Sequence, residues 1–269
     1  MLRLCRKEEV KRTKYTLTFK TFYSPKAIPQ NSKFKIQPLK EMKSKMIVKV
    51  CGLREPENIR DVEALGVDMV GLIFWKDSPR YVPMISAQAG IIPDYAWDQG
   101  ARNPHSSLLS QKVGVFVDDM PQNIVTRVYN YHLDWVQLHG SESPVMIDNL
   151  KRTLIPDISP NVKIIKAISV SRREDIERWR PYRGHVDMLL FDTKCKSVGG
   201  SGEHFDWSVL DSYDGDIPFL LSGGIGPEDA ERVKHFRHSQ FAGIDLNSRF
   251  ETSPGVKDIN LLKEFLKKL

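Results

Sequence analysis

The amino-acid sequence, 269 residues long, contains few cysteines and no long apolar segment. The three cysteines, Cys5, Cys51 and Cys195, are far apart and form no Cys-x-x-Cys pair. Such an odd and sparse set argues against a disulfide framework or a zinc site, and it is typical of a reducing compartment such as the cytoplasm. No segment reaches the ~18 apolar residues that a membrane-spanning helix needs. We therefore expect a cytoplasmic protein with no membrane contact and no metal.

The chain also lacks a general excess of positive charge, although its formal net charge is +6. Residues 1–45 carry 13 lysines and arginines against three acidic residues, whereas the remainder carries 27 basic and 31 acidic residues. The basic pI therefore belongs to the N-terminal segment alone. For the rest of the chain we expect no nucleic-acid partner.

The segment 1–45 has no apolar core of the kind found in a secretory signal and no clear period. We interpret it as a basic N-terminal extension that is disordered or results from an upstream start, because Met46 directly precedes the first apolar run. An organelle transit peptide and an RNA-binding arm are the alternatives. The folded catalytic domain is then expected over 46–269.

From Met46 onward, short apolar runs alternate with amphipathic segments. Continuous apolar runs are typical of strands buried on both faces, as in parallel sheets. The eight runs are 46–50, 68–74, 112–117, 134–138, 162–168, 187–192, 217–221 and 241–245.

Helix start signals follow most of these runs. Proline suits the first turn of a helix. The prolines so placed are Pro56, Pro121, Pro144 and Pro227. Ser171 and Glu174 have the spacing of a capping box after the fifth run. The last segment, 259–269, places its apolar residues on one helical stripe.

Eight such repeats predict an α/β protein, a single (β/α)8 TIM barrel, which typically takes ~250 residues. A doubly wound open sheet is the alternative. It usually shows a Gly-rich fingerprint after its first strand, and 51–56 is not one. Residues 84–111 are rich in Gly, Pro, Asn, Asp and Ser without a clear period, which predicts an irregular second helix region and a surface insertion.

Two reactive side chains stand at strand ends. Cys51 ends the first apolar run and Asp192 ends the sixth. In a barrel of parallel strands the carboxyl ends converge on one mouth, where a thiol and a carboxyl can work as base and acid. A lone cysteine at a strand end is more often a core residue, and a strand-end aspartate is often a helix cap.

Three glycine- or serine-containing loops are candidates for phosphate binding. Glycines let backbone N–H groups approach an anion, and phosphate-binding barrels use the loops after strands seven and eight. The candidate residues are Ser222, Gly223 and Gly224 after the seventh run, Asn247 and Ser248 after the eighth, and Gly200, Ser201 and Gly202 after the sixth.

Ordered motifs from 46 to 269 resemble the phosphoribosylanthranilate isomerase family of tryptophan biosynthesis. The motifs are Lys49-Val50-Cys51-Gly52-Leu53, Gly71-Leu72-Ile73-Phe74, Ser78-Pro79-Arg80-Tyr81-Val82, Val113-Gly114-Val115-Phe116, Val136-Gln137-Leu138-His139-Gly140, Leu190-Phe191-Asp192, Gly199-Gly200-Ser201-Gly202, Phe205-Asp206-Trp207, Leu221-Ser222-Gly223-Gly224-Ile225, Gly243-Ile244-Asp245 and Pro254-Gly255-Val256-Lys257-Asp258. Each motif alone is weak, but their order and spacing together make the resemblance specific.

The resemblance implies an Amadori rearrangement of N-(5′-phosphoribosyl)anthranilate without metal or organic cofactor. It implies Asp192 as the general acid and Cys51 as the general base. Arg80 is expected to orient the anthranilate carboxylate, Asp245 to lie near the amine, and His139 to contact substrate. We expect a phosphorylated small molecule as substrate and a monomer or weak homodimer.

Two features of the chain modify this expectation. Arg249 stands where the family often has glycine in the phosphate loop, and a guanidinium can itself contact phosphate. Lys49 shares a strand face with Cys51, so we expect a buried cluster of Lys49, Asp192 and Asp245 in which the ammonium favours the thiolate.

Three other functions compete with the isomerase. A barrel that binds a phosphorylated ligand without turnover would not need Cys51 and Asp192. An isomerase whose basic tail binds nucleic acid or membrane would change its behaviour when trimmed to Met46. A related barrel acting on a histidine-pathway aminoaldose would normally use two carboxylates in place of Cys51.

Overall fold

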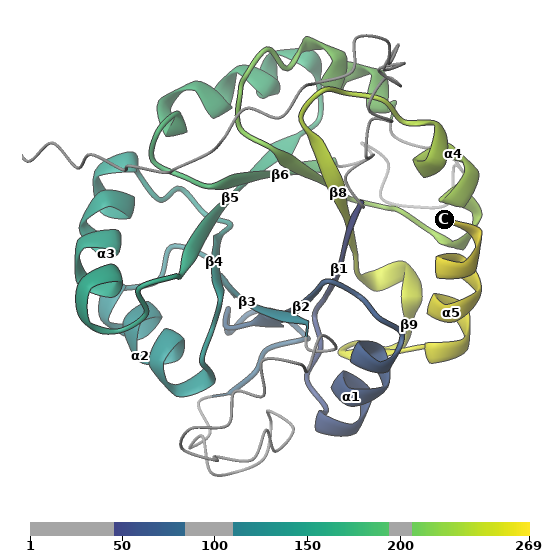
Figure 1. The fold of residues 1–269 in the computed structure, drawn as a ribbon, viewed down its shortest axis with the longest axis horizontal. Coiled ribbons are helices and arrows are strands. Elements are labelled where there is room, and N and C mark those ends of the chain that lie inside the picture. The colour runs from purple at the N-terminus through teal and green to yellow at the C-terminus, as the bar shows by residue number, and fades with distance from the viewer. Residues whose placement is uncertain (1–45, 84–109, 194–205) are drawn as a thin grey trace, which may run out of the picture. The chain divides into compact units, whose positions relative to one another are not determined.

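The eight apolar runs form parallel strands that close into a barrel (Figure 1). The computed structural model describes residues 46–83, 110–193 and 206–269. The barrel strands are β1 (Ile47–Cys51), β2 (Met69–Ile73), β3 (Gln111–Phe116), β4 (Trp135–Leu138), β5 (Lys163–Val170), β6 (Met188–Thr193), β7 (Phe219–Ser222) and β8 (Phe241–Leu246). Each strand pairs with its neighbours in sequence, and β8 closes on β1 with Lys49 opposite Asp245. The predicted TIM barrel is confirmed.

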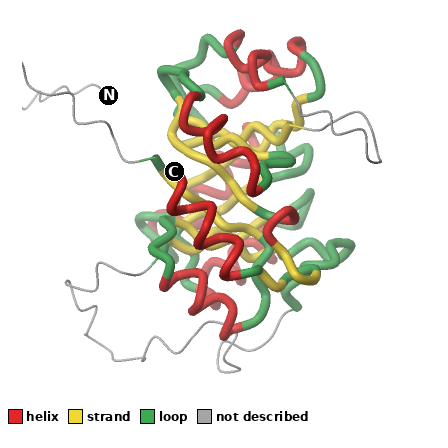
Figure 2. Tube along the Cα trace, turned by 90° about the vertical axis from the view of Figure 1, so that its right-hand side faces the viewer, coloured by secondary structure: helices red, strands yellow, loops and turns green. Residues whose placement is uncertain are grey.

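Helices surround this ring of strands, and a view turned by 90° shows the strands running between them (Figure 2). The α-helices are α1 (Pro56–Ala64), α2 (Pro121–Tyr131), α3 (Pro144–Asp157), α4 (Ala230–His235) and α5 (Ile259–Lys268). The 3-10 helices are η2 (Arg173–Tyr182), η3 (Trp207–Ser212), η4 (Pro227–Asp229) and η5 (Ser248–Phe250). The connection after β5 is thus a 3-10 helix, which is tighter than an α-helix.

The helix starts follow local capping chemistry, with one correction. Pro56, Pro121 and Pro144 occupy the first turns of their helices, and the Ser143 hydroxyl accepts a hydrogen bond from the Met146 amide. The predicted capping box with Glu174 is wrong. Asp175 takes that role instead, because its carboxylate accepts from the amides of Ser171 and Arg172 at 2.9 and 3.1 Å.

Side-chain alternation divides the buried residues into two sets. One set packs between the strands and the surrounding helices. The other fills the lower barrel interior with apolar side chains and forms a floor below the mouth. Its members are Met69, Val113, Trp135, Ile165, Ala167, Met188, Leu190 and Leu220. Polar side chains that continue the inward faces upward therefore meet at the carboxyl end of the barrel.

A short antiparallel ribbon follows β8 and was not predicted from the sequence. It consists of β9 (Glu251–Ser253) and β10 (Val256–Lys257). Gly255 sits in the connecting turn with φ of 91°, a left-handed conformation that glycine adopts without a steric penalty. This ribbon brings Glu251 and Lys257 close to the barrel mouth.

Some predictions fall outside the described residues. They concern the extension 1–45, most of the irregular second region, and the phosphate candidates Gly200, Ser201 and Gly202. Among the helices that the structure describes, none has the length and apolar character of a membrane span.

Candidate active site

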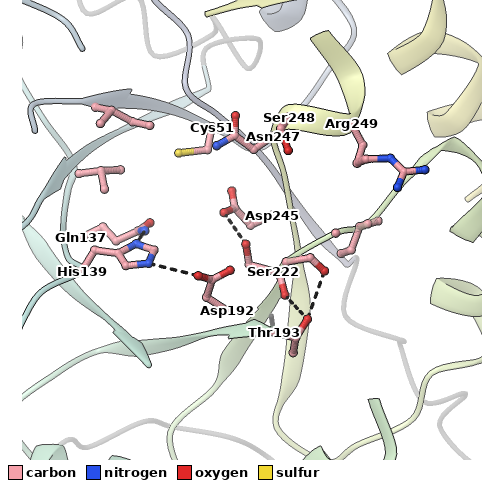
Figure 3. A pocket seen from close by; sticks show the side chains of 15 residues that line it. Cys51, Gln137, His139, Asp192, Thr193, Ser222, Asp245, Asn247, Ser248 and Arg249 are labelled. Atoms are coloured by element: carbon pink, nitrogen blue, oxygen red, sulfur yellow. Dashed lines mark hydrogen bonds and ion pairs between the residues drawn. The ribbon is translucent and has the colours of Figure 1, made fainter. Parts of the chain in front are cut away.

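A cavity of about 310 Å³ lies at the carboxyl ends of the barrel strands (Figure 3). It is lined by Cys51, Ile73, Val115, Gln137, His139, Asp192, Thr193, Ser222, Gly223, Gly224, Ile225, Asp245, Asn247, Ser248 and Arg249. Every predicted site residue within the described ranges lines this cavity except Arg80. The thiol of β1 and the carboxyl of β6 thus face one space, and the loops after β7 and β8 form part of its wall.

Cys51 sits beside a buried ion pair. The Lys49 ammonium, fully buried, donates to Asp245 Oδ1 at 2.8 Å, and the Ser222 hydroxyl donates to Asp245 Oδ2 at 3.0 Å. Gly71 lies opposite Cys51 on β2, where a Cβ atom would approach Cys51 Sγ to 2.7 Å. The glycine therefore provides the room for the thiol.

Opposing effects set the proton affinities here. Burial by itself lowers the pKa of Lys49, but Asp245 and Cys51 outweigh it, and the net pKa is raised. Burial raises the pKa of the Cys51 thiol, and Lys49 and Lys257 pull it down only in part. The thiol is thus a weaker acid than usual, and its thiolate is a correspondingly stronger base.

Asp192 contacts His139 and is not part of the Lys49 pair. His139 Nε2 lies 3.5 Å from Asp192 Oδ2, and Gln137 Nε2 donates to His139 Nδ1 at 3.0 Å. With Nδ1 accepting, the proton of a neutral imidazole is on Nε2 and faces the carboxylate. Of the expected cluster of Lys49, Asp192 and Asp245, the structure shows the contact between Lys49 and Asp245, whereas Asp192 contacts His139.

Gln137 is a site residue that the sequence analysis quoted only within a motif. Its side chain is buried, and its Oε1 has no hydrogen-bond partner among the described residues. A buried acceptor without a partner is costly, so this oxygen is available to a ligand in the cavity. The sequence signal was a polar residue on the same strand face as His139 within an apolar run.

The corner between β7 and β8 contains two glycines in left-handed backbone conformations, which other residues rarely adopt. Gly223 and Gly224 have φ of 95° and 69°. A Cβ atom on Gly223 would approach the Thr193 carbonyl oxygen to 2.0 Å, whereas one on Gly224 would meet nothing within 4 Å. The Thr193 hydroxyl donates to the carbonyls of Ser222 and Gly223 and holds the loop against β6.

Arg249 lines the same corner. Its guanidinium donates to Glu228 Oε1 at 2.5 Å, and both side chains are about half exposed. Arg249 therefore brings a solvent-accessible cation to the edge of the cavity.

Arg80 lies beside the cavity wall. A Cβ atom on Gly52 would approach Arg80 Cδ to 2.6 Å and Asn247 Oδ1 to 2.7 Å, which places both side chains next to the residue that follows Cys51. The guanidinium is ion-paired with Glu251 at 2.6 Å. Lys257 Nζ donates to Glu251 at 2.6 Å and to Asn247 Oδ1 at 2.8 Å.

Glu251 and Lys257, which the sequence analysis did not single out, contact the predicted residues Arg80 and Asn247. Lys257 stood within a quoted motif, and Glu251 follows the predicted phosphate loop in a segment that lacks the alternation typical of a strand.

Within the described ranges there is no group of three or more His, Cys, Asp or Glu residues suited to a metal ion.

The chain was compared with known proteins. The family model for N-(5′-phosphoribosyl)anthranilate (PRA) isomerase matches residues 48–268. A relative named N-(5′-phosphoribosyl)anthranilate isomerase from Parabacteroides distasonis is 45% identical over 224 residues, covering 83% of this chain and 93% of the relative.

Two solved structures are also similar. The phosphoribosyl anthranilate isomerase from Thermotoga maritima shares 30% identity at a TM-score of 0.62, over 83% of this chain and 98% of that one. A phosphoribosyl anthranilate isomerase in complex with reduced 1-(o-carboxyphenylamino)-1-deoxyribulose 5-phosphate shares 30% identity at a TM-score of 0.59, over 83% and 97%. Since the family model spans most of the chain, this protein belongs to the N-(5′-phosphoribosyl)anthranilate isomerase family.

Proposed function

We propose that this chain catalyses the Amadori rearrangement of N-(5′-phosphoribosyl)anthranilate to 1-(o-carboxyphenylamino)-1-deoxyribulose 5-phosphate, an isomerase step of tryptophan biosynthesis. The observation that carries the proposal is the meeting of Cys51 and Asp192 in one cavity whose wall includes two phosphate-type loops. Membership of the family supports the same reaction. This chemistry requires a general acid and a general base, and both can be supplied by side chains.

Asp192 acts first in the proposed sequence. Its protonated carboxyl gives a proton to the ribose ring oxygen, the bond from that oxygen to C1′ breaks, and the open chain is a Schiff base. His139 beside the carboxylate orients it toward the cavity. Gln137 in turn fixes the imidazole.

Cys51 acts second. Its thiolate takes the proton from C2′, and the electrons move to the nitrogen and give an enol, which tautomerises to the ketone. The buried ammonium of Lys49 stabilises the thiolate, while burial opposes its formation. At neutral pH only a small fraction of Cys51 is therefore thiolate, but that thiolate is a strong base.

The remaining roles concern binding. Arg80 orients the anthranilate carboxylate, and Asp245, fixed by Lys49 and Ser222, lies near the amine. The phosphate binds at the corner of Gly223, Gly224, Asn247 and Ser248. The Ser222 hydroxyl donates to Asp245, whereas Asn247 accepts from Lys257 through Oδ1 and keeps its Nδ2 hydrogens for a ligand. The phosphate donors at this corner are therefore the backbone amides, Asn247 Nδ2 and the Ser248 hydroxyl.

The assembly is proposed to be a monomer or weak homodimer. Obligate dimers bury large apolar faces. Among the described residues, the large apolar side chains that are clearly exposed are Trp75, Met120, Tyr129, Val145 and Ile155.

The need for a free thiol at Cys51 suits a reducing compartment, and on this ground we propose the cytoplasm.

The direct test is an activity assay with purified protein. N-(5′-phosphoribosyl)anthranilate is fluorescent, so turnover is followed as loss of its emission. Cys51→Ala and Asp192→Asn should each lower kcat by ~10²–10⁴-fold with modest change in KM, because a general acid or base typically contributes that factor. Rescue of a tryptophan auxotroph lacking this isomerase, with Cys51→Ala as control, gives the same answer in cells.

Two results would contradict the proposal. Tight binding of substrate without turnover would identify a binding protein. Near-normal turnover in either variant would reject the role given to that residue.

A further inference from the structure

Among the described residues, Glu251 holds the guanidinium of Arg80 along one edge. Its Nε donates to both oxygens of Glu251 at 2.8 and 3.1 Å, and Nη2 donates to Glu251 Oε2 at 2.6 Å. A guanidinium has five N–H donors in a rigid plane. Within the described part of the chain, Nη1 and the second hydrogen of Nη2 have no protein partner. As far as the described residues extend, the end of the fork is therefore open to a second carboxylate.

Glu251 is itself fixed from several sides. Its Oε1 accepts from the Gly255 amide at 3.2 Å and from Lys257 Nζ at 2.6 Å. The backbone of Lys257 is clamped by the Asn58 side chain, which donates to its carbonyl at 2.9 Å and accepts from its amide at 2.7 Å. The carboxylate that holds Arg80 is thus rigid, and so is the ammonium beside it.

The charges of this cluster determine what it can bind. The Arg80–Glu251 pair has no net charge, and Glu251 would repel an anion that approaches the open fork. The Lys257 ammonium, whose side chain is fully buried, offsets that carboxylate. The three residues together carry one positive charge, which matches one substrate carboxylate.

We propose that Glu251 and Lys257 are positioning and specificity-determining residues for the anthranilate carboxylate. Glu251 aligns Arg80 so that the open end of its fork receives the carboxylate, and Lys257 supplies the charge that prevents Glu251 from repelling it. This inference rests on the proposed function and goes beyond it by assigning two residues outside the cavity lining.

Removal of the buried charge is the test. Binding of two stable ligands is measured by calorimetry: 1-(o-carboxyphenylamino)-1-deoxyribitol 5-phosphate, and the same compound without the ring carboxylate. For Lys257→Met we expect the carboxylate ligand to lose about tenfold more affinity than the other ligand, since any change at Asn247 affects the phosphate of both ligands. Tenfold corresponds to ~1.4 kcal/mol.

The double variant Lys257→Met/Glu251→Gln separates charge from structure. It removes the uncompensated carboxylate, so it should regain part of the lost preference for the carboxylate ligand and should fold even where the single variant does not. If Lys257 only supported the ribbon, the double variant would be as weak as the single one, and both ligands would weaken equally. That result would overturn the inference.

The wild-type protein separates failure of the inference from failure of the function. A wild type that binds neither ligand and does not turn over substrate would contradict the proposed function. A wild type that is active, with variants that affect both ligands alike, would contradict only the roles of Glu251 and Lys257.

Discussion

At the scale of single residues, Cys51 is placed between two opposing effects. Burial favours the neutral thiol, whereas the Lys49 ammonium favours the thiolate, and burial dominates. The position of Lys49 is fixed by Asp245, which is 196 residues away in the chain. As the proposed base, the Cys51 thiolate is strengthened by burial, but burial also lowers the fraction of Cys51 that is thiolate.

The activity should therefore rise with pH along the titration of Cys51, at a pKa above the ~8.5 of a free thiol. Lys49→Met should move this limb to still higher pH, because the substitution removes a charge that lowers the pKa of Cys51. The rate of alkylation by iodoacetamide as a function of pH measures the thiolate directly. Lys163→Met, on the exposed start of β5, is the control. An unchanged alkylation profile in Lys49→Met would contradict the role of the ammonium.

At the scale of elements, the connection from β8 through η5 places Arg249 at the edge of the cavity. Glycine at position 249 would let the backbone approach a phosphate closely, whereas Arg249 offers a guanidinium instead. The ion pair with Glu228 keeps that guanidinium at the edge of the cavity before any ligand arrives. A phosphate with two negative charges competes well with one exposed carboxylate for the same donors.

We expect Arg249→Gly to weaken competitive inhibition by inorganic phosphate by about tenfold, as the loss of a hydrogen bond to a charged group implies. Arg249→Lys should retain part of the binding, because the charge remains but the planar fork is lost. Glu228→Gln removes the competitor and should strengthen inhibition. Equal or tighter phosphate binding in Arg249→Gly would instead show that the backbone alone makes this contact.

At the scale of the whole molecule, the site depends on closure of the barrel. β1 and β8, the first and last strands of the barrel, pair directly, and Gly243 lies opposite Ile47. A Cβ atom on Gly243 would approach the Ile47 carbonyl oxygen to 1.9 Å. Closure thus requires glycine here, since two strand backbones meet at this point and neither can move without shifting Lys49 or Asp245.

Gly243→Ala should lower the free energy of unfolding by roughly 1–3 kcal/mol, the usual cost of overpacking a core. It should also reduce kcat, because the closing register places Lys49 opposite Asp245. Urea denaturation measures the first effect and the fluorescence assay the second. Ser253→Ala, at an exposed position of β9, serves as control. Stability and activity equal to wild type would mean that the strands separate at this point without consequence.

The sequence by itself determined the barrel and the placement of Cys51 and Asp192 at strand ends that face one cavity. Apolar runs and proline signals are local patterns, and in a closed parallel barrel every strand ends at the same mouth. Cys51 and Asp192 followed from their place at strand ends together with the family motifs. The glycines after β7 followed from the backbone conformations that they allow. The capping box failed because Glu174 and Asp175 are adjacent carboxylates, and only the backbone geometry selects between them.

Only the tertiary structure decided which charged groups face one another. Arg80 and Glu251 are 171 positions apart, and their contact depends on the ribbon that folds back after β8. Asp192 on β6 contacts His139, which directly follows β4, because both side chains point into the barrel at the same level. No local sequence pattern predicts this contact. Periodicity reports what each segment buries, whereas pairing across a barrel depends on register and closure, which are properties of all the strands together.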